Sequence, residues 1–238
     1  MSVTLLAPAK LTVSLRVTGT RPDGFHELDA EMVSLDLADV VTFEDGDGLE
    51  INDDTGGLAI GTGPDNLVAR ALVVAGRAAF VRVDKRIPAG AGLGGGSADA
   101  AAVLRWAGID DIGVAAALGT DVCFCLRGGR ARVRGIGDVV EPLAYARRAY
   151  TLLIAPFGCS SPAVYRAWDE LGGPAASTNN DLELAALHVE PRLARWRDML
   201  GDATGQTPSL AGSGSTWFVE GAHPGDGRTV VHTVDASS

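Results

Sequence analysis

Residues 86–104 limit the structures that this chain can adopt more than any other stretch does. Five glycines fall between positions 90 and 96, although a glycine inside a helix or strand costs about 0.5–1 kcal/mol. Residues 98–104 are nearly all strong helix formers, with Ser97 placed as the N-cap and Asp99 in the first turn. A glycine loop that leads into a helix presents free backbone N–H groups and the positive end of the helix dipole. The stretch therefore predicts an anion site, and the usual anion is a phosphate.

Three interpretations of this loop compete. Gly90, Gly92 and Gly95 fit the dinucleotide-binding pattern G-x-G-x-x-G. That pattern requires a strand that runs directly into the first glycine, whereas residues 84–88 separate the apolar residues 80–83 from the loop. The P-loop pattern fails more clearly, because no Gly-Lys-Ser or Gly-Lys-Thr closes the run. The third interpretation is a flexible turn before an ordinary helix. We expect a phosphate site outside both familiar motifs, because the helix begins abruptly.

Composition and charge restrict the class of partner. With 238 residues, 46% of them hydrophobic, the chain can bury a core in one large or two small domains. No apolar run approaches the roughly 18 residues of a membrane span, and the first six residues lack the basic segment of a signal peptide. We therefore expect a cytoplasmic protein without a membrane partner. The net charge of −10 argues against nucleic acid. An anionic small substrate needs a local basic pocket, and the two lysines are Lys10 and Lys85.

The cysteines and histidines form no metal-ligand pattern. Cys123 and Cys125 lie two positions apart among apolar residues, and Cys159 stands alone. A C-x-C pair with one distant cysteine and scattered histidines is a poor zinc pattern. We interpret the cysteines as small buried apolar residues, and we predict no metal site built from protein ligands.

Hydrophobic alternation predicts mostly strands in the first part of the chain and an α+β sandwich in the second. The strands of the first part cover residues 3–7, 11–17, 28–37, 40–43, 49–51, 130–134 and 139–143, with a helix over 66–79 and a short one over 114–118. A boundary is predicted near residues 144–149. The second part has strands over 150–155, 216–220 and 228–234 and helices within 162–171, 181–187 and 191–200.

Three stretches resemble, in order and spacing, the motifs of the GHMP kinase superfamily. They are Pro8-Ala9-Lys10, the loop PAGAGLGGGSADAA at 88–101 and LAGSGS at 210–215. Further stretches are similar to the branch that phosphorylates a cytidine-diphosphate-linked sugar alcohol in isoprenoid precursor synthesis. These are RPDGFHEL (21–28), PDNLVARA (64–71), VDKRIP (83–88), LGTDVCF (118–124), GIGDVVEPL (135–143) and NDLE (180–183). The match spans about residues 8–218.

The resemblance implies an α+β fold of two domains. Residues 1–146 would form an N-terminal domain of the ribosomal-S5-domain-2-like type, with the phosphate loop and the catalytic residues. Residues 147–238 would form a shortened C-terminal ferredoxin-like α/β sandwich. The implied activity is ATP-dependent phosphorylation of an alcohol, with Mg²⁺ to neutralise the nucleotide phosphates. The implied partner is a small-molecule substrate, and we expect a monomer or a weak homodimer.

The resemblance also assigns residue roles. Asp121 would be the general base on the acceptor hydroxyl, and Lys10 would orient that hydroxyl and stabilise charge during transfer. His26 would hydrogen-bond the cytosine edge, with Phe25 beside it for stacking. The implied substrate-binding set is Thr12, Phe25, His26, Gly212, Ser213, Gly214 and Ser215. The implied nucleotide-binding set is Asn66, Lys85, Pro88, Gly90, Gly92, Leu93, Gly94, Gly95, Gly96, Ser97 and Asp99.

Some positions depart from the family pattern and leave alternatives open. Thr12 stands where the family usually carries asparagine, and Thr178-Asn179 stand where a second stacking aromatic can occur. Several connections and the tail after Phe218 are shorter than in the family. A homoserine- or mevalonate-type kinase of the same superfamily is one alternative, although neither substrate has a base for Phe25 and His26 to bind. A nucleotide-binding paralogue without catalysis is another, against which Lys10 and Asp121 argue.

Overall fold

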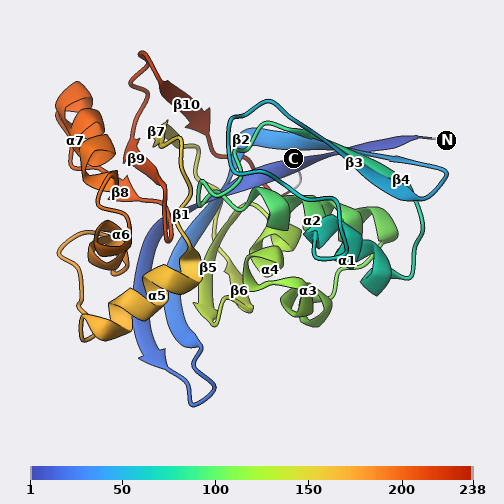
Figure 1. Ribbon diagram of the computed structural model, residues 1–238, viewed down its shortest axis with the longest axis horizontal. Helices are drawn as coiled ribbons and strands as arrows, with labels where there is room; N and C mark the ends of the chain where they lie inside the picture. Colours follow the sequence, from blue (N-terminus) through green and yellow to red (C-terminus); the bar gives the residue numbers. More distant parts are fainter. Residues whose placement is uncertain (1, 237–238) are drawn as a thin grey trace.

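The computed structural model describes residues 2–236, which form two β-sheets with helices packed against them (Figure 1). The larger sheet has the strand order β3-β4-β2-β5-β6, and β1 pairs with β2 off this path. The smaller sheet has the order β10-β7-β9-β8. Helices α1–α4 lie together on one side of the larger sheet, whereas α7 packs against the smaller sheet and α5 contacts the start of β2 (Figure 1).

The larger sheet and its helices take up the first part of the chain. Its strands are β1 Val3–Thr20, β2 His26–Glu44, β3 Gly48–Asp53, β4 Phe80–Lys85, β5 Arg130–Gly135 and β6 Val139–Pro142. The four helices are α1 Leu67–Ala75, α2 Gly95–Ala107, α3 Ile112–Leu118 and α4 Thr120–Arg127. The predicted helix over 66–79 is shorter than expected because the Asn66 side chain caps it and Gly76, at φ 59°, ends it.

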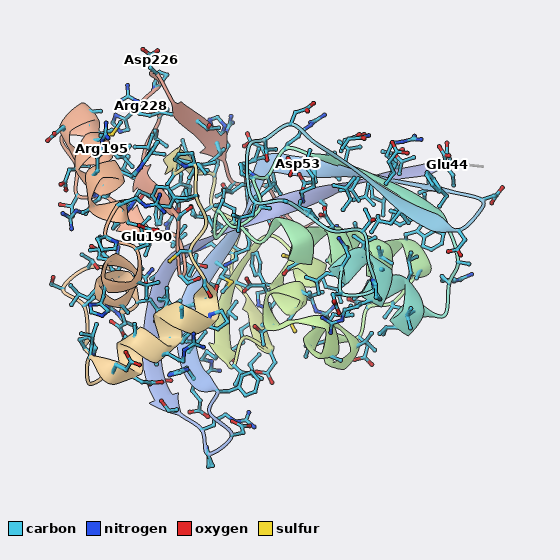
Figure 2. The ribbon with its side chains drawn as sticks, in the orientation of Figure 1. Glu44, Asp53, Glu190, Arg195, Asp226 and Arg228 are labelled. Atoms are coloured by element: carbon cyan, nitrogen blue, oxygen red, sulfur yellow. The ribbon has the colours of Figure 1, made fainter. Side chains whose placement is uncertain are left out.

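The smaller sheet and its helices follow residue 148. They comprise β7 Ala149–Ile154, α5 Ser161–Glu170, α6 Glu183–Val189, α7 Leu193–Thr204, β8 Ser209–Leu210, β9 Thr216–Glu220 and β10 Arg228–His232. All the strands and helices predicted for this part occur within a few residues of their expected bounds. The two-residue strand β8 was not predicted. Figure 2 shows the side chains of both parts on the same ribbon.

The first two strands correct the sequence prediction. The stretches 3–7 and 11–17 were expected as two strands, but β1 is one strand of 18 residues. The stretches 28–37 and 40–43 likewise belong to the single strand β2, and the two long strands pair with each other antiparallel. Register shifts between Pro8 and Lys10 and between Thr12 and Ser14 explain the difference. A β-bulge absorbs an unpaired residue and re-aims a side chain without ending the strand.

Helix α2 forms the centre of the core. Ala100, Ala101, Ala102, Val103 and Leu104 are all inaccessible to solvent. A row of alanines lets a helix approach its neighbours closely, and α2 packs against α1, α4 and β1. The helix that follows the glycine loop is therefore fixed on several sides, which in turn fixes the loop.

The two parts of the chain are joined by backbone hydrogen bonds near the middle of the molecule. The Leu15 N–H donates to the Asn179 carbonyl at 2.8 Å, and the Leu15 carbonyl accepts from Asp181 N–H at 3.0 Å. The Thr216 N–H and hydroxyl both donate to the Ala91 carbonyl, at 3.1 and 2.7 Å. Whether residues 144–149 divide two folding units stays a prediction.

Cys123 and Cys125 are buried, as predicted, and burial raises the pKa of their thiols to about 11 and about 12. Cys159 is only half-buried. Over residues 2–236, none of the helices has both the length and the apolar character needed to cross a bilayer.

We expect Leu104→Ala to lower the free energy of unfolding by about 2–5 kcal/mol, because it leaves a cavity in a fully buried part of α2. Denaturant-induced unfolding followed by circular dichroism measures this change. Val73→Ala is the matched control, since the Val73 side chain on α1 is 81% exposed, and surface changes usually stay within about 0.5 kcal/mol. A loss below about 1 kcal/mol for Leu104→Ala would contradict the central place of α2.

Candidate active site

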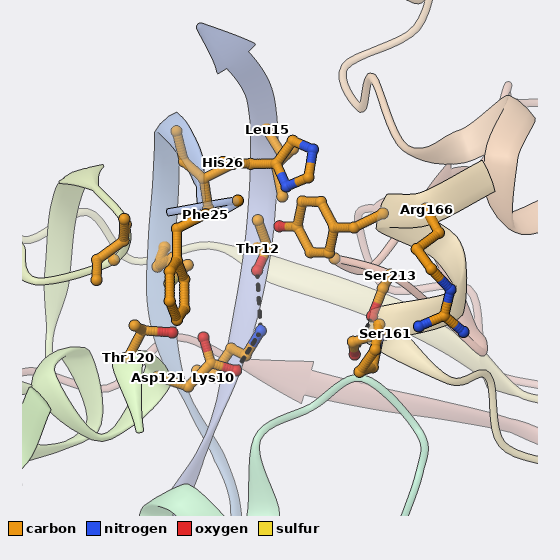
Figure 3. A pocket seen from close by; sticks show the side chains of 18 of the residues that line it. Lys10, Thr12, Leu15, Phe25, His26, Thr120, Asp121, Ser161, Arg166 and Ser213 are labelled. Atoms are coloured by element: carbon orange, nitrogen blue, oxygen red, sulfur yellow. Dashed lines mark hydrogen bonds and ion pairs between the residues drawn. The ribbon is translucent and has the colours of Figure 1, made fainter. Parts of the chain in front are cut away.

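Two cavities lie near the glycine loop: the loop itself lines one of them, and Lys10, which Gly94 approaches closely, lines the other. The larger has a volume of about 550 Å³ and is lined by β1, the start of β2, α4, α5 and the turn at 212–213. The smaller, which we call the loop cavity, has a volume of about 330 Å³ and is lined by residues 87–97 together with parts of α1. Figure 3 shows the side chains around the larger cavity.

Lys10, Thr12 and Asp121 form a polar cluster at one end of the larger cavity. The Lys10 ammonium lies 3.3 Å from the Asp121 carboxylate and donates to the Thr12 hydroxyl at 3.2 Å (Figure 3). The Lys10 side chain is 7% exposed, whereas that of Asp121 is 40% exposed. Lys10 comes from the bulged part of β1, and Asp121 from the first turn of α4. The structure thus brings together the two residues that the sequence predicts as catalytic, and the carboxylate remains accessible from the cavity.

The glycine loop lies directly over Lys10. Gly90, Gly92 and Gly94 have φ values of 80°, 79° and 69°, which side-chain-bearing residues rarely adopt. A Cβ on Gly94 would lie 2.7 Å from the Lys10 Cγ, and a Cβ on Gly92 would lie 2.5 Å from the Gly214 carbonyl oxygen. Backbone and lysine therefore meet at distances that only glycine allows.

The start of α2 differs from the prediction. The helix begins at Gly95, and the N-cap is Gly94 rather than Ser97. Ser97 lies inside the first turn, half-buried, and lines the loop cavity. Asp99 is beyond the first turn, and its carboxylate pairs with the Lys85 ammonium, which lies beside Gly95 at the start of the helix. The prediction failed because Gly94, in the left-handed conformation, ends the loop three residues earlier than a cap at Ser97 would.

Lys85 and Asp99 form a buried cluster with Asp39. The Lys85 ammonium pairs with the Asp39 carboxylate and lies 2.7 Å from that of Asp99. The side chains of Lys85 and Asp99 are 2% and 6% exposed. Both had been predicted to bind nucleotide. Both residues line the loop cavity. The Lys85 ammonium, paired with Asp39 and Asp99, fastens the end of β4 to β2 and α2.

Two carboxylates around one ammonium leave this buried cluster with a charge mismatch. Burial raises the pKa of Asp99 to about 7, although Lys85 acts to lower it and Asp39 adds to the rise. Burial acts to lower the pKa of Lys85, but the two carboxylates outweigh it and raise that pKa. Asp39 is fixed further because it accepts hydrogen bonds from the backbone N–H groups of Arg86 and Ile87 at 2.6 and 2.8 Å.

Asn66 also serves the fold. Its side-chain oxygen accepts from Val68 N–H at 2.8 Å, and its amide donates to the Gly61 carbonyl at 2.7 Å. Asn66 lines the loop cavity all the same, as do the other predicted nucleotide residues: Lys85, Pro88, Gly90, Gly92, Leu93, Gly94, Gly95, Gly96, Ser97 and Asp99.

The turn predicted to complete the site contributes half of its residues to the larger cavity. Gly212 and Ser213 line that cavity, whereas Gly214 contacts the loop at Gly92 and Ser215 is fully buried. The Asn180 amide donates to the carbonyls of Leu210 at 2.8 Å and Gly212 at 2.6 Å, and so holds the turn.

The other end of the larger cavity is aromatic. Phe25 is 54% exposed and lines the cavity. The His26 ring stacks on Tyr165 of α5, with ring centroids 4.8 Å apart, and contacts Trp168 edge-on at 5.6 Å. Its Nε2–H donates to the Asp169 carboxylate at 2.8 Å, because an ionised carboxylate only accepts. His26 is therefore 9% exposed in its side chain and is held by three residues of α5.

Tyr165 is the residue that sequence reasoning missed. It lines the same cavity as Phe25, and burial raises its pKa well above the usual value. In the family pattern a second aromatic can stand just before Asn180. In this chain the second aromatic at the cavity is Tyr165, on α5. The alternation of apolar residues on α5 could not reveal it, because Tyr165 fits the helix pattern as an ordinary core residue.

Within residues 2–236, no group of three or more histidine, cysteine, aspartate or glutamate side chains could hold a metal ion.

The larger cavity, the glycine loop over Lys10 and the two-sheet fold define a GHMP kinase. Residues 66–129 match the family described as the GHMP kinases N terminal domain. A solved structure of 4-(cytidine 5'-diphospho)-2C-methyl-D-erythritol kinase is 31% identical, covers 97% of this chain and 98% of its own, and superposes with a TM-score of 0.76. A homoserine kinase from Cytophaga hutchinsonii, 16% identical with a TM-score of 0.51, shares the fold.

Two relatives named 4-diphosphocytidyl-2-C-methyl-D-erythritol kinase show to which family of GHMP kinases the chain belongs. That of Paracoccus denitrificans is 39% identical over 89% of this chain and 84% of its own length. That of Ruegeria pomeroyi is 35% identical over 96% of this chain and 91% of its own length. The chain belongs to the 4-diphosphocytidyl-2-C-methyl-D-erythritol kinase family.

We expect the free energy of unfolding to fall as pH rises from about 4 to 7, because Asp99 loses its proton more readily in the unfolded chain than in the folded protein. In this window the folded state keeps a proton on Asp99, whose ordinary value of 3.8 applies to the unfolded chain. The folded state therefore binds more protons, and by linkage stability decreases with pH by up to about 1.4 kcal/mol per unit. In Asp99→Asn this contribution is absent, so the loss between pH 5 and pH 7 should shrink by about 2–3 kcal/mol.

Urea unfolding at both pH values measures the difference. Asp65→Asn is the control, since Asp65 is exposed and outside the cluster. An unchanged pH dependence in Asp99→Asn would show that the buried cluster keeps its charges in both states.

Proposed function

We propose that this chain transfers the γ-phosphoryl group of ATP to the 2-hydroxyl of 4-diphosphocytidyl-2-C-methyl-D-erythritol. The observation that carries the proposal is the Lys10–Asp121 pair, which lies at the end of the larger cavity and directly beneath the glycine loop at Gly94. Family membership supports the choice of reaction, since a kinase of this family uses ATP and a small-molecule alcohol.

The cluster supports an acid–base role for its two charged groups. Asp121, 40% exposed, can accept the proton of an alcohol placed against it, late in the transfer. Lys10 is held by Asp121 and Thr12, and its ammonium can contact both the acceptor oxygen and the transferred group. Phosphoryl transfer needs mainly positioning and charge stabilisation. Thr12 supplies a hydroxyl where the family usually has an amide.

The nucleotide is proposed to lie in the loop cavity. The backbone N–H groups of residues 90–97 and the N-terminus of α2 attract phosphate oxygens there. We propose that a Mg²⁺ ion accompanies ATP and that the Ser97 hydroxyl would help to hold it. Ser97 lines the loop cavity, and its hydroxyl has no hydrogen-bond partner among residues 2–236. When bound, the ion would neutralise charge on the nucleotide phosphates.

The aromatic end is proposed to receive the cytosine. Phe25 and Tyr165 offer two ring faces at the larger cavity, and an aromatic face stacks on any base. Because Asp169 engages Nε2 of His26, the polar groups left to meet the base edge are Nδ1 and the main chain of His26. A homoserine- or mevalonate-type substrate has no base to fill this end.

The organisation beyond the site follows the same proposal. Residues 1–146 would act as the N-terminal unit with the phosphate loop, and 147–238 as the shortened C-terminal unit. A cytoplasmic monomer or weak homodimer that binds no nucleic acid remains our expectation.

We expect Asp121→Asn to lower kcat by roughly 10²–10⁴-fold, the range for loss of a general base, and to leave ATP affinity nearly unchanged. A coupled assay of ADP release gives kcat, and fluorescent-nucleotide titration gives the affinity. Asp110→Asn is the control, because Asp110 is 72% exposed in a surface ion pair with Arg127. Full turnover in Asp121→Asn would refute the assignment of the base.

The substrate itself is tested by comparing three acceptors in the same assay. We expect ADP release with 4-diphosphocytidyl-2-C-methyl-D-erythritol and at most about 1% of that rate with homoserine or mevalonate, since each lost stacking contact costs about 1–3 kcal/mol. Equal rates with all three acceptors would favour a different kinase of the superfamily. Nucleotide binding without turnover of any acceptor would favour the paralogue without catalysis.

A further inference from the structure

Arg166 of α5 is a positive charge at the larger cavity that the proposed mechanism does not use. It lines the cavity, is exposed, and has no hydrogen-bond or ion-pair partner among residues 2–236. In Figure 3 its guanidinium is turned toward the end of the cavity where Ser161 and Ser213 lie. An arginine without a partner at a cavity wall is free to bind an anion.

Arg166 differs from the other charged residues around the cavity in having no partner of opposite charge. The lysine and arginine side chains among the described residues that line it are Lys10 and Arg166, and the acids are Asp121 and Asp169. Lys10 is already compensated by Asp121 at 3.3 Å, and Asp169 is engaged by His26. In a chain of net charge −10, an anionic ligand entering this cavity finds one uncompensated cation.

Two hydroxyl groups line the same cavity. The Ser161 and Ser213 side-chain oxygens lie 2.6 Å apart, from the first residue of α5 and from the turn at 212–213. In such a pair one hydroxyl donates to the other, and the accepting hydroxyl keeps its own proton for a further acceptor. A guanidinium with one spare O–H donor matches the oxygens of a phosphate.

We propose that Arg166, with the Ser161–Ser213 pair, binds the diphosphate group of the substrate and so selects cytidine diphosphate derivatives over cytidine itself. The inference rests on the proposed function, which places the base against Tyr165, the neighbour of Arg166 on α5. Arg166 is thereby a specificity residue: it contacts the part of the substrate between the base and the reacting alcohol.

The test compares inhibition by CDP and by cytidine in the full-length protein. In the unmodified chain we expect CDP to bind more tightly than cytidine. Arg166→Ala should weaken CDP about 10-fold, because a charge-assisted hydrogen bond is lost, with cytidine and the KM for ATP unchanged. Arg166→Lys should recover part of the loss, since it keeps the charge without the fork. Arg195→Ala on α7 is the matched control, because Arg195 is exposed and lies away from the cavity (Figure 2).

Each outcome decides the matter. A selective loss of CDP binding supports the inference. Unchanged CDP binding, or equal losses of CDP and cytidine, overturns it while the proposed function stands. A rise in the KM for ATP in place of the CDP effect also overturns it, because the arginine would then serve the nucleotide triphosphate. If the unmodified chain binds neither CDP nor cytidine, the proposed function fails, and the inference with it.

Discussion

The Lys10 side chain passes beneath Gly94, so close that a single added carbon on the glycine would lie 2.7 Å from it. The rest of the site depends on this contact. The Lys10 N–H donates to the Leu93 carbonyl at 2.9 Å, which ties β1 to the loop, and Thr216 ties the loop to the smaller sheet through the Ala91 carbonyl. Strand, loop and second sheet therefore fix one another's positions, and the ammonium is placed by the fold before any ligand arrives.

The distribution of charge explains how an acidic chain can receive polyanions. Two lysines are present, and one of them, Lys85, is neutralised inside the protein by Asp39 and Asp99. At the loop cavity the attraction for phosphate therefore comes mainly from groups without a formal charge, namely the loop N–H groups and the α2 terminus. Lys10 and Arg166 supply positive charge at the larger cavity. A buried ion cluster beside the loop gives it rigidity and adds no positive charge to the site.

Much of the site could be predicted from sequence, and the failures have physical causes. The glycine loop, Lys10 and Asp121 were identified because short motifs carry them, and they do lie together. Tyr165 was missed because its helix position is that of a core residue, and the Lys85 cluster because its three members come from β2, β4 and α2. Pro8 was read as the end of a strand, whereas the pairing of β1 with β2 continues across it through a bulge. Contacts between distant segments decide each of these points, and a local pattern does not contain them.

The bulges of β1 have a consequence for how such a chain can change in length. Between Pro8 and Ser14 the strand shifts register twice, and side chains alternate between faces along each regular piece. Deleting or inserting one residue there would turn Lys10 or Thr12 toward the opposite face. Exposed connections on the surface carry no comparable requirement for the face on which a side chain lies. Insertions and deletions are therefore tolerated at such connections, whereas the segment of seven residues that contains the two bulges must keep its length.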